Sequence, residues 1–509
     1  MSLIKKLAGE TAIYGVSSIL GRLLNYVIMT PFLTRIFVRE EYGVVTDMYA
    51  TSAILMVLFT YRIETAFFRF GKEKKDLNRV FSSSSILLLC TTLFFVALLF
   101  IFSEPIAALL EHPGKGNYFR IFAVIIGADA LSAIPFARLR LINRPLVFAA
   151  IRLVNIVVNI LFILFFLWLC PYFAERGWPM DWIYDAEDQI KYVFLSNMIA
   201  SLVMLLLLSP SYFNLKWRFD KKIVKKMLWY AGPLVIAGIA GIINQMIGIP
   251  FIKYIATPDE ATNMKLVGDF GAAVKIPVLM TLFTQAFNYA AEPFFFRNAD
   301  RSDAKDVYGQ VAQAFTIVAA FAFLGIMLYL DLLQFILGKD LRGGLGIVPI
   351  MLIAYLFLGW FYNFSIWYKL QDRTIVGGYI ALGGAAITLL LNFILVPQIG
   401  IYGPAWAALA CYGFMAFLTY RTGQQNYKIN YPIRTMLLYV IVSLSGFFAS
   451  EWLQSLLGYG LLLKTMLNTL ILVLCLVAYS AIDSTIFNGI IRAFLSVLNR
   501  RKTTEQTKE

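Results

Sequence analysis

The chain has 509 residues, of which 60% are hydrophobic, and its mean hydropathy is +0.73. Soluble domains are nearer half apolar, so this composition excludes an ordinary soluble protein and indicates many membrane-spanning segments. The formal charge of +14 would favour nucleic-acid binding in a soluble chain, but here the basic residues gather in loops between apolar runs, so no nucleic-acid partner is expected.

Apolar stretches long enough to cross a bilayer recur along the whole chain. Fourteen of them are predicted to be transmembrane helices. They cover residues 11–34, 43–68, 80–103, 119–137, 146–169, 190–209, 227–252, 267–296, 309–337, 347–368, 375–397, 402–420, 435–455 and 461–482. The 44 Lys and Arg residues concentrate in the termini and in alternate loops, which by the positive-inside rule places both termini in the cytoplasm. The predicted fold class is therefore an all-α polytopic membrane protein.

The segments outside the predicted spans leave little room for a soluble domain. The longest loop, 170–190, is acidic and aromatic, and the tail 483–509 is predicted to begin as an amphipathic helix and to end disordered. The sequence has no Walker A motif, so ATP is not expected to drive the protein directly. His112 is a lone loop histidine for which no special role is expected. We expect no cofactor, metal site or enzyme activity, and H+ or Na+ coupling or the membrane potential alone would supply the energy.

Two short motifs recur at nearly the same separation, which indicates an internal duplication. Residues 23–32, LLNYVIMTPF, match residues 242–251, IINQMIGIPF, and residues 64–69, ETAFFR, match residues 292–297, EPFFFR. The matches fall in the first and second spans and in the seventh and eighth, so the repeat unit has six spans. An even number of spans leaves both copies in the same orientation, and the two six-helix lobes should be related by a pseudo-two-fold axis along the membrane normal.

The repeat divides the chain into predicted domains. These are an N-lobe over residues 1–209, a C-lobe over residues 210–421, two extra spans over residues 422–482, and a cytoplasmic tail over residues 483–509. Two lobes that rock against each other would expose a central cavity first to one side of the membrane and then to the other.

Ionisable side chains inside spans cost roughly 2.5–3.5 kcal/mol at the bilayer centre and are functional candidates for that reason. The candidates chosen within the predicted spans are Arg22, Asp47, Arg62, Glu64, Asp129, Arg152, Lys275 and Glu292. Arg62 lies near the cytoplasmic end of its span, where snorkelling to the surface would also account for its charge. Lys275 and Asp47 lie in the outer halves of their spans.

Arg22 is the deepest of these charges. It lies about 16 Å inside its span at ~1.5 Å per residue, too far to reach either surface easily. Asn25 shares a helix face with Arg22, so this polar stripe should point inward. Arg22 aligns with Gly241 in the second copy of the repeat, so lobe folding cannot require the charge. This asymmetry favours a role in the transport path over an ion pair with a carboxylate.

Glu64 and Glu292 occur at equivalent positions of the two copies. Structural ion pairs, with Arg69 and Arg297 as the expected partners, are favoured, and coupling to protons or sodium is the alternative. The full set of coupling or gating candidates is Asp47, Glu64, Asp129 and Glu292, and the full set of substrate-cavity candidates is Arg22, Asn25, Arg62, Arg152 and Lys275.

Two segments resemble a known family. The N-terminal segment ILGRLLNYVIMTPFLTRIFVREEYGVVTDMYA resembles the start of polysaccharide-synthesis (O-antigen, Wzx-type) flippases, especially in the EYG at residues 41–43. The segment LLLNFILVPQIGIYGPAWAALACY, residues 389–412, resembles the family's Asn-x4-Pro-x2-Gly-x2-Gly element between two late spans. These flippases belong to the multidrug/oligosaccharidyl-lipid/polysaccharide exporter superfamily, and the resemblance covers the first twelve predicted spans.

The resemblance implies a flippase of the bacterial plasma membrane that moves an undecaprenyl-pyrophosphate-linked oligosaccharide from the inner to the outer leaflet. Its expected partners are this lipid-linked oligosaccharide and membrane lipids, together with a polysaccharide polymerase and glycosyltransferases. Arg22 and Lys275, with Arg62 and Arg152 nearer the inner mouth, would bind the pyrophosphate through charge-assisted hydrogen bonds.

Other functions stay open on the sequence alone. A lipid-linked peptidoglycan precursor has nearly the same chemistry as the proposed cargo. A cation-coupled drug exporter of the same superfamily is less well matched, because the deep charge here is positive. A membrane polymerase or acyltransferase is disfavoured, because the outer loops are short and no acidic residue follows His112 four or five positions on.

Overall fold

The computed structural model describes residues 23–24, 26–72, 74–180, 182–213, 217–458 and 460–487. All regular elements in these ranges are helices, which confirms the predicted all-α class. In this described part, eleven helices are long and apolar enough to cross a membrane, and a twelfth span results if one interrupted helix pair is counted as a single span. Each predicted span from 43–68 onward coincides with a long helix or a helix pair, whereas most of the predicted span 11–34 and of the tail lies outside the described residues.

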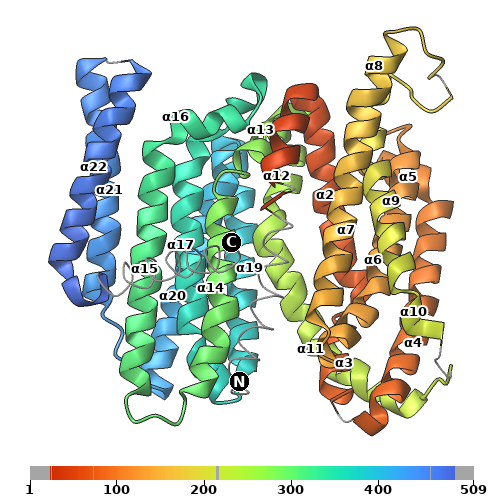
Figure 1. Cartoon of the computed structure of the whole chain (residues 1–509), viewed down its shortest axis with the longest axis horizontal. Coiled ribbons are helices and arrows are strands. Elements are labelled where there is room, and N and C mark those ends of the chain that lie inside the picture. Colours follow the sequence, from red (N-terminus) through yellow and green to blue (C-terminus); the bar gives the residue numbers. More distant parts are fainter. Residues whose placement is uncertain are drawn as a thin grey trace, which may run out of the picture. The chain divides into compact units, whose positions relative to one another are not determined.

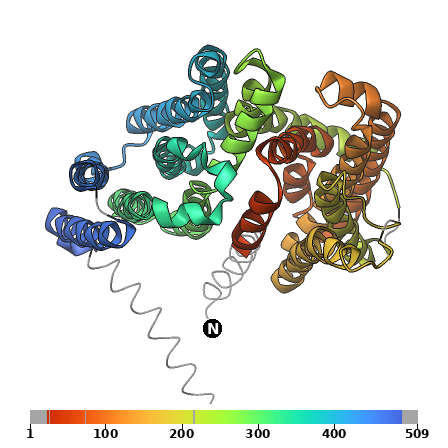
Figure 2. The same cartoon turned by 90° about the horizontal axis from the view of Figure 1, so that it is seen from above.

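The chain forms two compact units, Met1–Gly271 and Ala272–Glu509, which run from red to light green and from green to blue in Figure 1. Figure 2 views many helices of each unit along their axes. The units are defined by packing and the predicted lobes by the sequence repeat, so the lobe boundaries stay a prediction. The helices of the first unit are α2 (Arg39–Thr60), α3 (Ile63–Phe70), α4 (Lys74–Ile101), α5 (Ser103–Leu109), α6 (Gly116–Leu141), α7 (Pro145–Leu164), the π-helix η1 (Phe165–Leu169), α8 (Cys170–Ala174), α9 (Ile190–Leu208), α10 (Pro210–Phe213), α11 (Lys221–Met246), α12 (Gly248–Ile255) and α13 (Glu260–Ala273), whose last residues already belong to the second unit.

The second unit continues with long helices joined by short helical turns. Its elements are α14 (Val278–Arg297), α15 (Ala304–Leu328), α16 (Leu330–Leu333), the 3-10 turns η2 (Gln334–Ile336), η3 (Lys339–Arg342) and η4 (Leu345–Ile347), α17 (Val348–Phe364), α18 (Ile366–Leu370), α19 (Thr374–Ile399), α20 (Tyr402–Asn426), α21 (Ile433–Leu457) and α22 (Leu461–Ile482).

Helix α6 forms the centre of the first unit and packs against α4 and α9. Aromatic rings fill its junction with α9. The ring centres of Phe122 and Phe194 are 4.7 Å apart, and those of Tyr118 and Phe194 are 5.1 Å apart. Edge-to-face contacts of this kind contribute about 0.5–1.5 kcal/mol each beyond the area they bury. They hold α6 and α9 together, and these two helices carry the polar residues Asp129 and Ser201.

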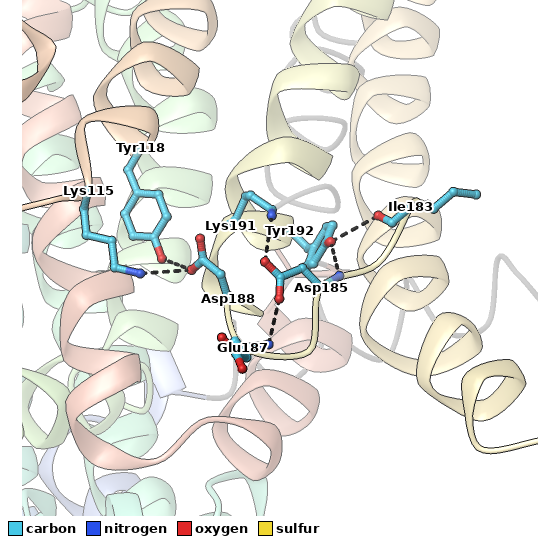
Figure 3. Close-up of polar contacts among 8 residues, drawn as sticks. All are labelled: Lys115, Tyr118, Ile183, Asp185, Glu187, Asp188, Lys191 and Tyr192. Carbon is cyan, nitrogen blue, oxygen red and sulfur yellow. Dashed lines mark hydrogen bonds and ion pairs between the residues drawn. The ribbon is translucent and has the colours of Figure 1, made fainter. Parts of the chain in front are cut away.

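The loop between α8 and α9, which is predicted to lie on the outer side, is fastened by polar contacts (Figure 3). Asp188 accepts a hydrogen bond from the Tyr118 hydroxyl and another from Lys115 Nζ at 3.3 Å. The Tyr192 hydroxyl accepts a hydrogen bond from the Asp185 amide at 2.6 Å. The acidic residues that the sequence places in this loop therefore serve to anchor it to the ends of α6 and α9.

Helix α20 forms the centre of the second unit and packs between α17 and α19. The Asn-x4-Pro-x2-Gly-x2-Gly element makes the reversal from α19 to α20. Gly400 ends α19 with a φ of 55°, a region that glycine adopts without strain. A Cβ on Gly403 would lie 2.8 Å from the Val396 nitrogen, so the reversal also needs a glycine there. This element is therefore a tight helical hairpin.

Candidate functional site

The predicted site residues are distributed over both units. Arg22 and Asn25 lie outside the described residues, so their roles stay predictions. Of the remaining candidates, Asp47, Arg62, Glu64, Asp129 and Arg152 belong to the first unit, and Lys275 and Glu292 belong to the second. Their surroundings differ, and these differences separate anchoring residues from candidates for transport.

Arg62 sits at a break within a span, close to its C-terminal end. Tyr61 and Arg62 both adopt left-handed backbone angles, with φ of 32° and 55°, and they separate α2 from α3. Such angles cost non-glycine residues about 1–2 kcal/mol each, and residues strained in this way cluster at functional sites. The Arg62 side chain packs against α11 at Gly238, where a Cβ would lie only 2.6 Å from Arg62 Nε. Gly238 thus makes room for a half-buried guanidinium.

Asp47 lies in a buried cluster with Lys253 and His112. Lys253 Nζ, on α12, donates to Asp47 Oδ2 at 2.7 Å, and His112 Nε2 lies 2.7 Å from the same oxygen. The exposed fractions of Asp47, Lys253 and His112 are only 4%, 2% and 6%. Removal of one partner from a buried ion pair costs about 3–5 kcal/mol. The cluster therefore fixes α2, α12 and the loop 110–115 to one another within the first unit.

The hydrogen positions in this cluster follow from the distances. Lys253 carries only donors and an ionised Asp47 only acceptors, so their contact is charge-assisted. His112 Nε2 lies near both Asp47 Oδ2 and Lys253 Nζ, at 2.7 and 3.1 Å. A hydrogen on Nε2 satisfies the carboxylate, whereas a bare Nε2 would direct a lone pair at it, so we assign the Nε2–H tautomer. The expectation that His112 has no special role is wrong, because its ring completes this buried cluster.

Helix α2 is also fastened to α13 within the first unit. Arg39 Nε donates to Asp269 Oδ1 at 3.0 Å, and Arg39 Nη2 completes a bidentate pair with the other carboxylate oxygen. Gly43 and Gly268 let the two helices approach closely, because a Cβ on either would meet a backbone carbonyl of the other helix. This end of α2 is thus held both by Arg39 and by Asp47. Because Lys253 already neutralises the Asp47 carboxylate, we assign Asp47 an anchoring role.

Asp129 on α6 is the candidate with an unsatisfied oxygen. It accepts a hydrogen bond from Ser201 of α9 and interacts electrostatically with Arg152 of α7. Its buried Oδ1 has no hydrogen-bond partner among the described residues. The Tyr49 hydroxyl, which accepts a hydrogen bond from Asn197 at 3.1 Å, also interacts with Asp129. A buried carboxylate oxygen without a partner is costly, and a proton or cation at that oxygen would remove the cost. Asp129 is therefore the strongest coupling candidate in the first unit.

Arg152 on α7 rests against aromatic rings. Its guanidinium carbon lies 4.3 Å from the ring centre of Phe136 and 5.8 Å from that of Phe148. The side chain is exposed, and cation–π contacts at exposed sites contribute about 0.5–1 kcal/mol. These rings, together with Asp129, account for the position of Arg152 without a ligand, so it is a weaker cavity candidate than Arg62.

Glu64 and Glu292 form equivalent ion pairs in their respective units. Glu64 Oε2 lies 3.5 Å from Arg140 Nη2, and Glu292 Oε1 lies 3.0 Å from Lys369 Nζ. The expected partner Arg69 instead lies over an aromatic ring, 4.4 Å from its centre. The Glu64 and Glu292 side chains are 36% and 49% exposed, so each pair contributes only about 0–1 kcal/mol. A shared anchoring role is the simplest account of both.

The cations that pair with the two glutamates begin a third duplicated segment, which the sequence comparison missed. Residues 140–145 read RLINRP and residues 369–374 read KLQDRT. The two segments are 229 positions apart, next to the 228 positions that separate Glu64 and Glu292. The internal repeat therefore extends at least to the end of the fourth span of each copy.

The two segments also share their backbone geometry. Asn143 and Asp372, at equivalent positions, have φ of 59° and 54°. The following amides, of Arg144 and Arg373, donate to the carbonyl five residues earlier at 2.9 and 2.8 Å. Asparagine and aspartate tolerate this left-handed conformation better than most residues, which explains their presence at this corner. The sequence repeat thus encodes a repeated helical corner.

Lys275 lies where the helix is interrupted between α13 and α14. The Lys275 amide donates to the Ala272 carbonyl at 3.1 Å, as in a tight turn, and Pro277 has no N–H to continue the α-helical pattern. The side chain is half-buried, and no described carboxylate or hydrogen-bond acceptor is paired with it. An unpaired cation at a helix interruption is a candidate for binding an anionic ligand.

Sequence reasoning missed Lys253, the central cation of the Asp47 cluster. The predicted span 227–252 ends one residue before it, which places Lys253 in a loop. The signal that could have identified it is a single cation within the apolar run IPFIKYI, residues 249–255. His112 has no comparable local signal, because only the fold brings its loop to α12.

Comparison with protein families gives one match. The model of a family described as "Polysaccharide biosynthesis protein" matches residues 7–299. Among curated proteins, no match was found.

Solved structures of two kinds of transporter are similar in fold. The lipid II flippase MurJ, in an inward closed conformation, gives a TM-score of 0.70 at 16% identity over 94% of this chain and 99% of that chain. The MATE multidrug transporter DinF-BH gives 0.58 at 15% identity over 84% and 96%. A mutant of the Vibrio cholerae MATE transporter VcmN gives 0.51 at 13% identity over 82% and 96%. At these identities the similarity shows the fold alone.

Proposed function

Because this chain belongs to the polysaccharide biosynthesis protein family of the multidrug/oligosaccharidyl-lipid/polysaccharide exporter superfamily, we propose that it is a flippase for a lipid-linked oligosaccharide. The family match carries the proposal, and the fold shared with a lipid flippase and with multidrug transporters supports it. The cargo would be an undecaprenyl-pyrophosphate-linked oligosaccharide, moved from the inner to the outer leaflet of the bacterial plasma membrane by alternating access of two lobes. Both termini would lie in the cytoplasm.

The pyrophosphate of this cargo needs cationic partners, and Arg22, Arg62 and Lys275 are the best candidates. Arg62 and Lys275 are half-buried within equivalent spans, each lies at a helix interruption, and neither has an ion-pair partner among the described residues. Transporters commonly place substrate sites at such interruptions. Arg22, with Asn25 on the same helix face, is supported by the sequence alone. Each charge-assisted hydrogen bond to the cargo would contribute about 1.5–3 kcal/mol.

The energy for transport would come from the membrane potential. The pyrophosphate carries negative charge outward from an inside-negative compartment, which favours transport by roughly 2.3 kcal/mol per charge per 100 mV. In vesicles with an imposed potential, the flipping rate should therefore rise when the cargo-loaded side is negative. A rate that ignores the potential but responds to a pH or sodium gradient would instead assign the coupling to Asp129, whose unsatisfied oxygen is available for a proton or a cation.

The direct test of the function is complementation of a strain that lacks its oligosaccharide flippase. Arg22→Ala should abolish glycan display while the protein stays in the membrane, and Arg22→Lys should retain part of the activity because it keeps the charge. The matched control is Gly241→Ala, at the equivalent position of the second copy, which should stay active because a Cβ there meets open space. Full activity of Arg22→Ala at normal protein level would contradict the proposed role of Arg22.

Purified protein in vesicles would distinguish the cargo. Vesicles with a lipid-linked oligosaccharide and vesicles with a lipid-linked peptidoglycan precursor should give different flipping rates, and the proposal requires the first to be faster. Glycosyltransferases would supply this cargo on the inner side, and a polymerase would consume it on the outer side. Transport of the peptidoglycan precursor alone would replace the proposed cargo but keep the flippase mechanism.

A further inference from the structure

A cavity of about 530 Å³ opens in the first unit at the far end of α6 from the Asp47 cluster. It is enclosed by the ends of α4, α6, α7, α9 and the short α10. The predicted span 119–137 ends one residue before Arg138, which lines the cavity. The cavity thus lies at the predicted cytoplasmic surface of the membrane, at the level of lipid head groups, and its volume is typical of a small-molecule site.

Two arginines supply the charge of this cavity. Arg138 Nη1 donates to the Ser211 carbonyl at 2.9 Å and Nη2 donates to Asn78 Oδ1 at 3.2 Å, which fixes the plane of the guanidinium. Arg138 Nε is buried and has no hydrogen-bond partner among the described residues. Arg144 is exposed, lines the same cavity and acts on Arg138 as a like charge. None of the described residues that line the cavity is a carboxylate. Two like charges held together without a counter-ion attract an anion.

The walls of the cavity are apolar and reach the lipid-facing surface. Ile142, Val147 and Leu207 line it and are 40%, 42% and 42% exposed, which is expected for side chains that contact acyl chains in a membrane. A free anion would gain nothing from these walls, whereas a lipid would place its phosphate on the arginines and its acyl chains along α7 and α9. Basic pockets between spans on the cytoplasmic side bind lipid head groups in this way.

We propose that the cavity between Arg138 and Arg144 binds the phosphate head group of a lipid from the inner leaflet. Arg144 is the exposed cation that would contact the phosphate, and Arg138 is the one held in place by Ser211 and Asn78. The site is separate from the transport residues proposed above, so it does not depend on the identity of the cargo.

The internal repeat supports this assignment, because the second copy keeps only one of the two arginines. Arg138 corresponds to Trp367, 229 positions later, whose buried indole donates to the Thr419 carbonyl at 3.2 Å. Arg144 corresponds to Arg373, which donates instead to Asn426 at 3.0 Å. The same helical corner therefore occurs with a buried indole in place of the Arg138 guanidinium, and with its arginine bonded to an amide. The cation at position 138 is an addition to the corner, not a requirement of it.

Photo-crosslinking of the full-length protein in vesicles tests the proposal. The vesicles would contain phosphatidylcholine with a small fraction of phosphatidylglycerol that carries a photoreactive group near its head group. Crosslinked peptides should include residues 138–151 and 207–211. Arg144→Gln should reduce this crosslinking about tenfold, the effect of losing one charge-assisted contact. Arg144 is suited to the test because it is exposed and its loss should not affect folding.

Two control variants show whether the crosslinked lipid occupies this cavity. Arg373→Gln removes the equivalent arginine of the second copy and should leave crosslinking at residues 138–151 unchanged. Val147→Trp fills the cavity but keeps both charges, and it should lower crosslinking as strongly as Arg144→Gln. Unchanged crosslinking in Arg144→Gln and Val147→Trp would overturn the site. Displacement of the probe by inorganic phosphate as readily as by unlabelled phosphatidylglycerol would overturn the lipid source, and displacement by phosphatidylglycerol alone would support it.

Discussion

The second span of the first copy is formed by α2 and α3, and its counterpart in the second copy by α13 and α14. The two spans share their C-terminal residues and differ before them. Both end in Glu-x-x-Phe-Phe-Arg, with Glu64 and Glu292 separated by 228 positions. At the same separation, Asp47 of the first copy is replaced by Lys275 of the second. Asp47 is buried in ion pairs, whereas Lys275 has no ion-pair partner among the described residues. Equivalent positions thus carry opposite charges, and only the negative one is neutralised by described ion-pair partners.

The interruptions of the two spans also differ. In the second copy Pro277 lacks the N–H that would bond to the Ala273 carbonyl, and the helix stops there. In the first copy the break falls at Tyr61 and Arg62, without a proline or glycine. Through Glu64 and Glu292 the shared C-terminal residues bind the repeated corner in both copies. The residues before them differ, so each copy carries its own charges within the span. That is the pattern expected if the two lobes contact different parts of an asymmetric cargo.

The largest effect is expected from neutralising the buried carboxylate of the first copy. Asp47→Asn leaves Lys253 buried without a counter-charge, so the free energy of unfolding should fall by about 3 kcal/mol. Denaturant unfolding of the purified protein in detergent would measure the loss. Asp47→Leu combined with Lys253→Met removes both charges and should restore most of the stability. A single substitution that is as stable as the original protein would show that the Asp47 cluster carries no such energy.

The opposite sign is expected at the equivalent position of the second copy. Lys275→Met removes a half-buried cation that has no described partner, so stability should stay the same or rise by about 1 kcal/mol. Transport should nevertheless fall in the vesicle assay, because the cation is proposed to bind the cargo, and Lys275→Arg should retain part of it. A clear loss of stability in Lys275→Met would show that the side chain has a structural partner and would end the contrast with Asp47.

The repeated corner predicts matched, smaller effects. Asn143→Ala and Asp372→Ala each place a residue that disfavours left-handed angles at φ of 59° and 54°, and each should cost about 0.5–1 kcal/mol. Asn143→Gly and Asp372→Gly should be nearly neutral. The same unfolding measurement applies to all four variants. A cost at only one of the two corners would show that the surroundings, and not the shared backbone, determine this conformation.

The all-α fold and nearly all spans follow from the sequence, because a membrane demands long apolar helices. The ion-pair partners of the site residues do not follow from the sequence. Arg140 reads as a loop charge in the sequence, yet it pairs with Glu64. The repeated segment that begins at Arg140 is hard to detect, because the two copies keep charge and backbone angle more than residue identity. The break at Arg62 has no local breaker residue to signal it. Lys253 and His112 meet Asp47 only through tertiary packing, which no local pattern contains.

The smallest effect is expected from the glutamates that the two copies share. Glu64→Gln and Glu292→Gln each weaken an ion pair whose glutamate is at least 36% exposed, so each should cost at most about 0.5 kcal/mol. The two losses should add in the double variant, because the pairs share no residue. Transport should persist in both single variants if the glutamates only anchor the corners. Loss of transport in one of them, with stability unchanged, would instead identify that glutamate as the coupling residue and would make the two copies functionally unequal at a position that they share.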